Sequence, residues 1–134
     1  HVTGVQTCAL PISGYIGGQL PNPTYEEVCT DKTGHAEAVQ VEYNPDEISF
    51  EELLDVFWNN HNPTTLNRQG PDIGIQYRSA IFYHDEQQKN IAQKSKQILD
   101  DSGKYGASIV TEIVPAPVFY KEEYHQKYFK KCGM

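Results

Sequence analysis

The sequence predicts an α+β protein built as a two-layer α/β sandwich, in which helices pack on one face of a small mixed sheet. Two observations predict this class. Stretches with alternating apolar residues, typical of strands, take turns along the chain with stretches of helical period. The helical stretches begin at residues that cap helices, and the extended stretches end at Asn, Gly or Pro.

The composition is that of one soluble globular domain, with 134 residues of which 38% are hydrophobic and 22% charged. A net charge of -7 argues against nucleic acid and anionic membranes as partners. No apolar run approaches the roughly 20 residues of a membrane span. Three cysteines, without metal-ligand spacing, favour a reducing compartment, and we expect a cytoplasmic protein with no bound metal.

Residues 1–13 are expected to stand apart from the domain that follows, residues 14–134. They have a short apolar centre but neither a basic start nor a small-residue cleavage site, so a signal peptide is not indicated. The stretch Val2–Ile12 resembles the translation of a sequencing-library adapter, and we expect an artefactual leader that includes Cys8. The alternative is a genuine, divergent N-terminal strand.

The domain is expected to open with a loop rich in Gly and Pro, from Gly14 to Pro23. A short polar segment follows and carries Tyr25, whose hydroxyl is a candidate hydrogen-bond donor. Cys29 comes next in a further loop, and an isolated cysteine of this kind is most often a bystander.

The first strand is predicted from Glu37 to Tyr43, where Glu37 shares the apolar face of Val39, Val41 and Tyr43. A buried, unpaired carboxylate is costly, and it usually becomes protonated. A neutral carboxylic acid at the edge of a core can donate a proton at neutral pH. The alternative is that Glu37 lies just before the strand and points at solvent or at an arginine.

A helix is predicted from Phe50 to His61, ending before a proline. Ser49 and Glu52 form a capping box, and Ile48 is placed to pack on the first turn as a hydrophobic staple. The apolar residues fall on one stripe that faces the core, and they are Phe50, Leu53, Leu54, Phe57 and Trp58.

The long segment from Asn62 to Gln76 has no period and is expected to be a functional loop. It leads into a predicted strand, Tyr77–Tyr83. Asp85 then caps a predicted helix, Glu86–Asp100, with apolar positions that include Ile91, Ile98 and Leu99.

The C-terminal part is expected to add a strand over Ser108–Val114 and a tail over Lys121–Lys131. The tail is expected to form a short helix or turn, because aromatic residues recur every four positions at Tyr120, Tyr124 and Tyr128. The apolar faces of these elements also call for a further strand and helix ahead of Gly14.

Several ordered motifs mark residues 14–129: Gly14-Tyr-Ile-Gly-Gly18, Pro21-Asn-Pro-Thr-Tyr-Glu-Glu-Val-Cys29, Thr33-Gly-His-Ala-Glu-Ala-Val39, Val56-Phe-Trp-Asn-Asn-His61, Arg68-Gln-Gly-Pro-Asp-Ile-Gly-Ile-Gln-Tyr-Arg-Ser-Ala-Ile-Phe-Tyr83 and Tyr124-His-Gln-Lys-Tyr128. Together they closely resemble the peptide methionine sulfoxide reductase A family. The resemblance implies a ferredoxin-like mixed sheet, here with its N-terminal strand and helix missing. It also implies reduction of methionine S-sulfoxide, free or in proteins, to methionine through a cysteine sulfenic acid.

The resemblance assigns roles residue by residue. It implies that Glu37 is the acid that protonates the sulfoxide oxygen, and that Tyr25 and Tyr77 donate hydrogen bonds to that oxygen. Asp72 falls in the active-site loop. Cys132 matches the region of a recycling thiol, and the alternative is an unpaired thiol in the tail. Thioredoxin or another dithiol is implied as reductant, with no cofactor, and we expect a monomer.

One family motif has no counterpart here, because the chain contains no Gly-Cys-Phe-Trp-Gly, the segment that supplies the nucleophilic cysteine. Cys8 is a poor substitute, since it has no aromatic neighbours and stands too close to Gly14. The alternative function is therefore that of a non-catalytic fragment of the enzyme, which binds sulfoxide weakly at most.

Overall fold

A computed structural model describes residues 9–122 and confirms the mixed α+β class. Its regular elements are β1 (Ala9–Ile16), α1 (Tyr25–Cys29), β2 (Ala36–Tyr43), α2 (Phe50–Asn59), β3 (Arg68–Gln69), β4 (Asp72–Ile73), the 3-10 helix η2 (Ile75–Tyr77), β5 (Ala80–Tyr83), α3 (Glu86–Asp101), β6 (Glu112–Pro115) and β7 (Phe119–Lys121). Cys8, Cys132, Tyr124 and Tyr128 lie outside the described residues.

The described strands form three separate sheets instead of the one mixed sheet expected. β1 lies between β2 and β7 and runs antiparallel to both. β5 and β6 pair in parallel, and β3 and β4 form a short hairpin. Among residues 9–122, β2 pairs only with β1, and β5 pairs only with β6, so no strand pairing joins these two sheets.

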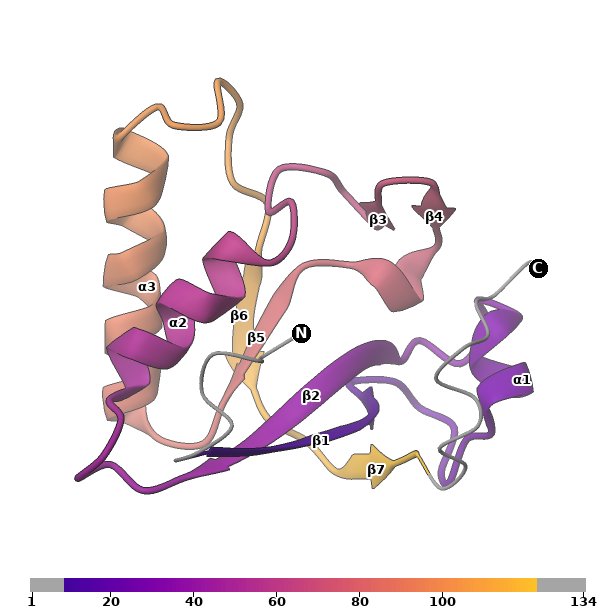
Figure 1. Ribbon diagram of the computed structural model, residues 1–134. Coiled ribbons are helices and arrows are strands. Elements are labelled where there is room, and N and C mark those ends of the chain that lie inside the picture. Colours follow the sequence, from indigo (N-terminus) through magenta and orange to yellow (C-terminus); the bar gives the residue numbers. More distant parts are fainter. Residues whose placement is uncertain (1–8, 123–134) are drawn as a thin grey trace.

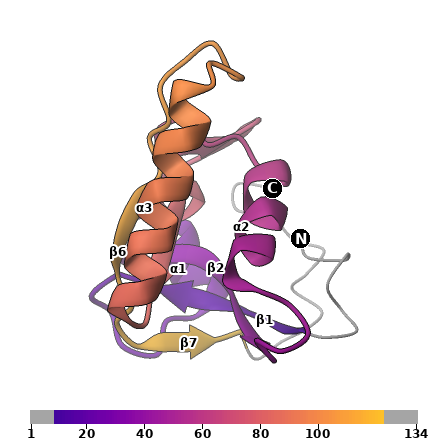
Figure 2. The same cartoon turned by 90° about the vertical axis from the view of Figure 1, so that its left-hand side faces the viewer.

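The helices divide between two ends of the molecule (Figure 1). α2 and α3 are in contact and lie side by side, and α3 also contacts β5 and β6 (Figure 2). α1 and the β3–β4 hairpin lie at the opposite end, at the right of Figure 1. No helix within residues 9–122 has the length and apolar character needed to cross a membrane.

The main core lies between the pair of helices and the parallel strands. Its buried members are Leu54, Trp58, Ile81, Ala92 and Ile109. The indole N–H of Trp58 donates to Ser95 Oγ at 2.8 Å, so the polar edge of the largest core side chain is satisfied. A smaller cluster surrounds Ile48, against which Val41, Tyr43, Leu53 and Val56 pack.

The predicted signals of α2 are confirmed. Ser49 Oγ accepts from the backbone N–H of Glu52, and the Glu52 carboxylate accepts from the backbone N–H of Ser49, so both halves of the capping box are present. Leu53 packs on Ile48, as a hydrophobic staple requires. Asp85 likewise caps α3, its side chain accepting from the N–H of Gln88 at 2.8 Å.

Other boundaries differ from the prediction. β1 runs from Ala9 to Ile16, so it includes part of the segment expected to stand apart and part of the Gly14–Pro23 segment expected to be a loop. The polar segment around Tyr25 is helical, because Thr24 and Glu27 form a second capping box. β5 begins at Ala80 and β6 at Glu112, later than predicted.

Ile98 was expected on the core face of α3, but it is 61% exposed. Its neighbour Leu99 takes the place next to the core. A helix turns about 100° per residue, so Ile98 and Leu99 point in different directions, and here Leu99 is the one that packs on the core.

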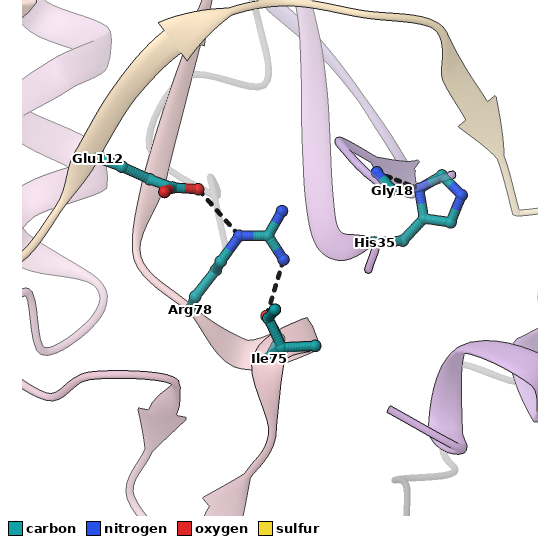
Figure 3. A network of polar contacts seen from close by, with 5 residues as sticks. All are labelled: Gly18, His35, Ile75, Arg78 and Glu112. Atoms are coloured by element: carbon teal, nitrogen blue, oxygen red, sulfur yellow. Dashed lines mark hydrogen bonds and ion pairs between the residues drawn. The ribbon is translucent and has the colours of Figure 1, made fainter. Parts of the chain in front are cut away.

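His35 joins the start of β2 to the loop after β1 (Figure 3). It is buried, its Nδ1 accepts from the N–H of Gly18 at 3.0 Å, and its Nε2–H donates to the Leu20 carbonyl at 2.7 Å. The N–H of Gln19 also donates to the Thr33 carbonyl at 2.9 Å. These bonds fix the loop that leads from β1 to α1.

His61 links α2 to the parallel strands through a chain of hydrogen bonds. Its Nδ1–H donates to the Phe57 carbonyl at 2.7 Å, and its Nε2 lies 2.7 Å from Ser79 Oγ. Ser79 Oγ in turn lies 2.6 Å from Thr111 Oγ1, inside the core. Since a carbonyl can only accept, Nδ1 must carry a proton, and in the neutral ring Nε2 then accepts from Ser79.

The first prediction concerns the pH dependence of stability. Burial lowers the pKa of His61 from its ordinary value of 6.5, although the bond to Phe57 opposes the shift. The unfolded chain therefore binds this proton more readily, and the free energy of unfolding should fall as pH drops through 6.5 toward the lower pKa of the folded state. The free energy of unfolding of the wild type and of His61→Gln can be measured in urea between pH 8 and 5. It should fall less steeply with decreasing pH in the variant than in the wild type. Equal slopes would contradict the neutral, buried ring.

The second prediction concerns the contact made by Gly18. A Cβ on Gly18 would overlap the Thr33 carbonyl oxygen and the His35 amide nitrogen. Both are backbone atoms, which cannot avoid the overlap by a change of rotamer. Gly18→Ala should therefore lower the free energy of unfolding by about 1–3 kcal/mol, as overpacking typically does. Gly103→Asn is the control, since Gly103 has open space around it and a φ of +68° that Asn tolerates. If both substitutions lower the free energy of unfolding in urea by a similar, small amount, the close contact at Gly18 does not contribute to stability.

Candidate active site

A cavity of about 870 Å³ opens between β1 and β2 on one side and α2, β5 and the segment around Tyr77 on the other. Tyr25, Glu37 and Tyr77 all line it, although they come from three separate elements. The structure therefore brings together three of the residues that the sequence marked as catalytic. Asp72 lies in β4 and does not line this cavity, and Cys132 lies outside the described residues.

Glu37 lies within β2, as predicted, but it is exposed instead of buried. Val39, on the same face of the strand, is 42% exposed. Further along, Val41 and Tyr43 pack on the Ile48 cluster. The expectation of an inward carboxylate at the edge of a core is therefore wrong for the described chain. The physical reason is that this end of β2 faces an open cavity, where water still reaches the carboxylate.

Tyr25 is the first residue of α1, and the capping box before it fixes where that helix begins. Thr24 Oγ1 accepts from the N–H of Glu27 at 3.1 Å, and the Glu27 carboxylate accepts from the N–H of Thr24 at 2.9 Å. Burial raises the pKa of Tyr25, and the negative charges of Glu37 and ionised Tyr77 raise it further. The three groups thus lie within electrostatic reach of one another.

Tyr77 was predicted to begin a strand, but it ends the 3-10 helix η2. Gly74 precedes this turn with a φ of +150°, a conformation that is unfavourable for residues with a side chain. The carbonyl of Gly74 accepts a hydrogen bond from the N–H of Tyr77 at 3.0 Å. Arg78, the residue after η2, connects this 3-10 helix to β6. Its Nε–H donates to Glu112 at 2.9 Å, and its Nη1–H donates to the Ile75 carbonyl at 3.0 Å (Figure 3).

Tyr15 also lines the cavity, and no sequence pattern had marked it as a site residue. It lies directly opposite Glu37 in the β1–β2 pair and opposite Tyr120 in the β1–β7 pair. Burial raises the pKa of its hydroxyl, and the carboxylates of Glu122 and Glu37 add to the effect. The Gly14-Tyr-Ile-Gly-Gly18 motif contained this residue, but its role depends on strand pairing that the motif does not reveal.

Cys29 was expected to be a bystander, yet it is disulfide-bonded in the structure. It is the last residue of α1, so this bond restrains the same short helix that carries Tyr25. The chain's other cysteines, Cys8 and Cys132, lie outside the described residues. Within residues 9–122, no three His, Cys, Asp or Glu side chains gather as a metal site would require.

The arrangement suits one kind of ligand. Two phenol hydroxyls can donate hydrogen bonds to a single polar oxygen, and a carboxyl group beside them can donate a proton to it. Apolar side chains of α2 and β5 line the same cavity, among them Phe57 and Phe82. The site can therefore receive a small apolar group that carries a strongly accepting oxygen.

Comparison with known proteins identifies the family of the chain. The family model described as peptide methionine sulfoxide reductase matches residues 1–133. A protein of Methanoculleus marisnigri named peptide methionine sulfoxide reductase MsrA is 58% identical over 134 residues, which cover 99% of this chain and 80% of that protein. A relative of the same name from Methanothermobacter thermautotrophicus is 58% identical over 119 residues, 88% of this chain and 70% of that protein.

Solved structures show the same fold. The reduced form of Mxr1 from Saccharomyces cerevisiae superposes with a TM-score of 0.86 at 33% identity, over 98% of this chain and 79% of that one. Methionine sulfoxide reductase A of Corynebacterium diphtheriae gives a TM-score of 0.83 at 32% identity, over 98% of this chain and 71% of that one. The chain therefore belongs to the peptide methionine sulfoxide reductase family.

Proposed function

We propose that the cavity binds the S epimer of methionine sulfoxide, free or in a polypeptide, and that its oxygen lies among Tyr25, Tyr77 and Glu37. The observation that carries this proposal is that these three residues, from three elements, line one cavity, with Glu37 and Tyr77 both within electrostatic reach of Tyr25. A sulfoxide oxygen carries much of the negative charge of its polar S–O bond, so two hydroxyl donors suit it. The apolar part of the cavity suits the methyl group on the sulfur.

Glu37 acts as the general acid in the proposed reaction. The carboxylate is exposed to solvent, and a bound sulfoxide would reduce that exposure and favour the neutral acid. The acid then gives its proton to the sulfoxide oxygen while a thiolate attacks the sulfur. In sum, one thiol and one sulfoxide become a sulfenic acid and a thioether, so the oxygen passes from the substrate to the cysteine.

The thiol and its regeneration complete the proposed cycle. A second thiol converts the sulfenic acid to a disulfide and releases water, and thioredoxin or another dithiol then reduces that disulfide. Cys132 is the candidate for this second thiol. The sequence contains no Gly-Cys-Phe-Trp-Gly, and Cys29 is already disulfide-bonded. We therefore propose that this chain alone recognises the sulfoxide without turning it over.

The third prediction tests recognition and turnover together. N-acetyl-methionine S-sulfoxide methyl amide, titrated into the chain by NMR, should shift the ring signals of Tyr25 and Tyr77, and the R epimer and the thioether should bind more weakly. The same chain, incubated with this sulfoxide, thioredoxin, thioredoxin reductase and NADPH, should produce no N-acetyl-methionine methyl amide above the background. Equal binding of both epimers would contradict the proposed site, and steady turnover would show that a cysteine of this chain is the nucleophile.

The fourth prediction isolates the acid. In a chimera that carries a family member's Gly-Cys-Phe-Trp-Gly segment ahead of Gly14, Glu37→Gln keeps the size of the side chain but removes the transferable proton. Single-turnover reduction should slow by about 10²- to 10⁴-fold, the usual contribution of general acid catalysis, while sulfoxide binding changes little.

Glu42→Gln in the same chimera is the matched control, because Glu42 is also exposed on β2 but does not line the cavity. It should react at the parent rate. A Glu37→Gln rate within about threefold of the Glu42→Gln rate would remove Glu37 from the proton transfer.

A further inference from the structure

The two tyrosines of the site stand on short segments with little regular structure of their own. Tyr25 belongs to a helix of 5 residues and Tyr77 to a 3-10 helix of 3 residues. Helices this short are not stable by themselves, so contacts with the rest of the protein must hold them. The distance between the two hydroxyls therefore depends on whatever joins these segments.

Asp31 provides a direct link between them. Its backbone N–H donates to the Val28 carbonyl at 3.1 Å, which attaches it to the end of α1. Its Oδ1 accepts from the backbone N–H of Ile75 at 2.7 Å, across a sequence separation of 44 residues. One residue thus holds the C-terminal end of the Tyr25 helix and the first residue of the Tyr77 turn.

The backbone conformation of Asp31 indicates that its side chain has a structural role. Its φ is +64°, in the left-handed region, where Gly is the residue most often found after a helix and Asn is the next. Asp accepts this conformation at some cost, which the bond to Ile75 can offset. A residue chosen only to end α1 would need no carboxylate.

Ile75 is held from the opposite side as well. Its carbonyl accepts from Arg78 Nη1–H at 3.0 Å, and Arg78 is itself paired with Glu112 of β6 (Figure 3). The peptide groups of Ile75 therefore connect α1, through Asp31, with the parallel strands, through Arg78. Loss of the Asp31 bond would remove this link between η2 and the end of α1, while the link from Ile75 through Arg78 to β6 would remain.

We propose that Asp31 is a positioning residue, which holds η2 against the end of α1 and so sets the spacing between the Tyr25 and Tyr77 hydroxyls. This role rests on the proposed function, because the spacing matters only if both hydroxyls bind the same oxygen. Asp31 itself does not line the cavity and need not touch the substrate.

Three variants of the chain separate the carboxylate from its backbone conformation. Asp31→Asn keeps an oxygen acceptor and tolerates a positive φ, so it should behave as the wild type does. Asp31→Gly fits the same φ without strain but has no acceptor. Asp46→Gly is the matched control, since Asp46 is exposed in the turn after β2 and does not line the cavity.

The measurement uses NMR on chain labelled with ¹⁵N and with ¹³C-tyrosine, without added reductant, because Cys29 at the end of α1 is disulfide-bonded. Asp31→Gly should speed the exchange of the Ile75 amide and move the ring signals of Tyr25 and Tyr77. It should also weaken binding of N-acetyl-methionine S-sulfoxide methyl amide by about three- to tenfold, the value of one net hydrogen bond. Asp31→Asn and Asp46→Gly should leave all three readouts near the wild type.

The outcomes separate this proposal from the proposed function. Unchanged tyrosine signals and affinity in Asp31→Gly, with an intact fold, would overturn the positioning role even if the wild type binds sulfoxide. An Asp31→Asn variant that fails as Asp31→Gly does would also overturn it, because the acceptor is then not what matters. If the wild type binds no sulfoxide, the proposed function fails, and the Ile75 exchange and the tyrosine signals still decide whether Asp31 sets the spacing.

Discussion

The antiparallel register of β1 on β2 is the constraint on which the site depends. It places Tyr15 opposite Glu37 and extends from Ala9 paired with Tyr43 to Ile16 paired with Ala36. Because side chains alternate across a strand, a slip of one residue would turn the carboxylate to the other face of the sheet. His35, two residues before Glu37, secures the beginning of this pairing by bonding the loop that leaves β1. The position of the acid is thus set by backbone geometry on both strands.

The tyrosines are placed by different means. Neither is on a strand, and each depends on a local signal: a capping box before Tyr25, and a glycine with a positive φ, Gly74, before Tyr77. Side-chain bonds from Asp31 and Arg78 then connect these local structures to the rest of the fold. A strand therefore carries the proposed acid, while two short helical segments carry the proposed hydroxyl donors. Functional residues often lie on loops that a scaffold holds in this way.

The sequence was most informative where signals are local. The capping box at Ser49, the Asp85 cap and the alternation of β2 predicted their elements correctly, because each signal depends on a few neighbouring residues. Burial of Glu37 could not be predicted, since alternation identifies a face of a strand but not what covers that face. The link through Asp31 joins positions 44 residues apart, and no periodicity reports such a contact. The family motifs marked Tyr25, Glu37 and Tyr77, which all line the cavity, but the motifs do not reveal which elements carry these residues or how the fold brings them to one cavity.

The central claim is that Tyr25, Tyr77 and Glu37 together bind one sulfoxide oxygen. The most direct test is a crystal structure of this chain with N-acetyl-methionine S-sulfoxide methyl amide. We expect the sulfoxide oxygen within about 2.5–3.0 Å of both tyrosine hydroxyls and of the Glu37 carboxyl group, the range for O–H···O bonds. A ligand bound elsewhere, or with its oxygen turned toward solvent and its methyl group against the tyrosines, would contradict it.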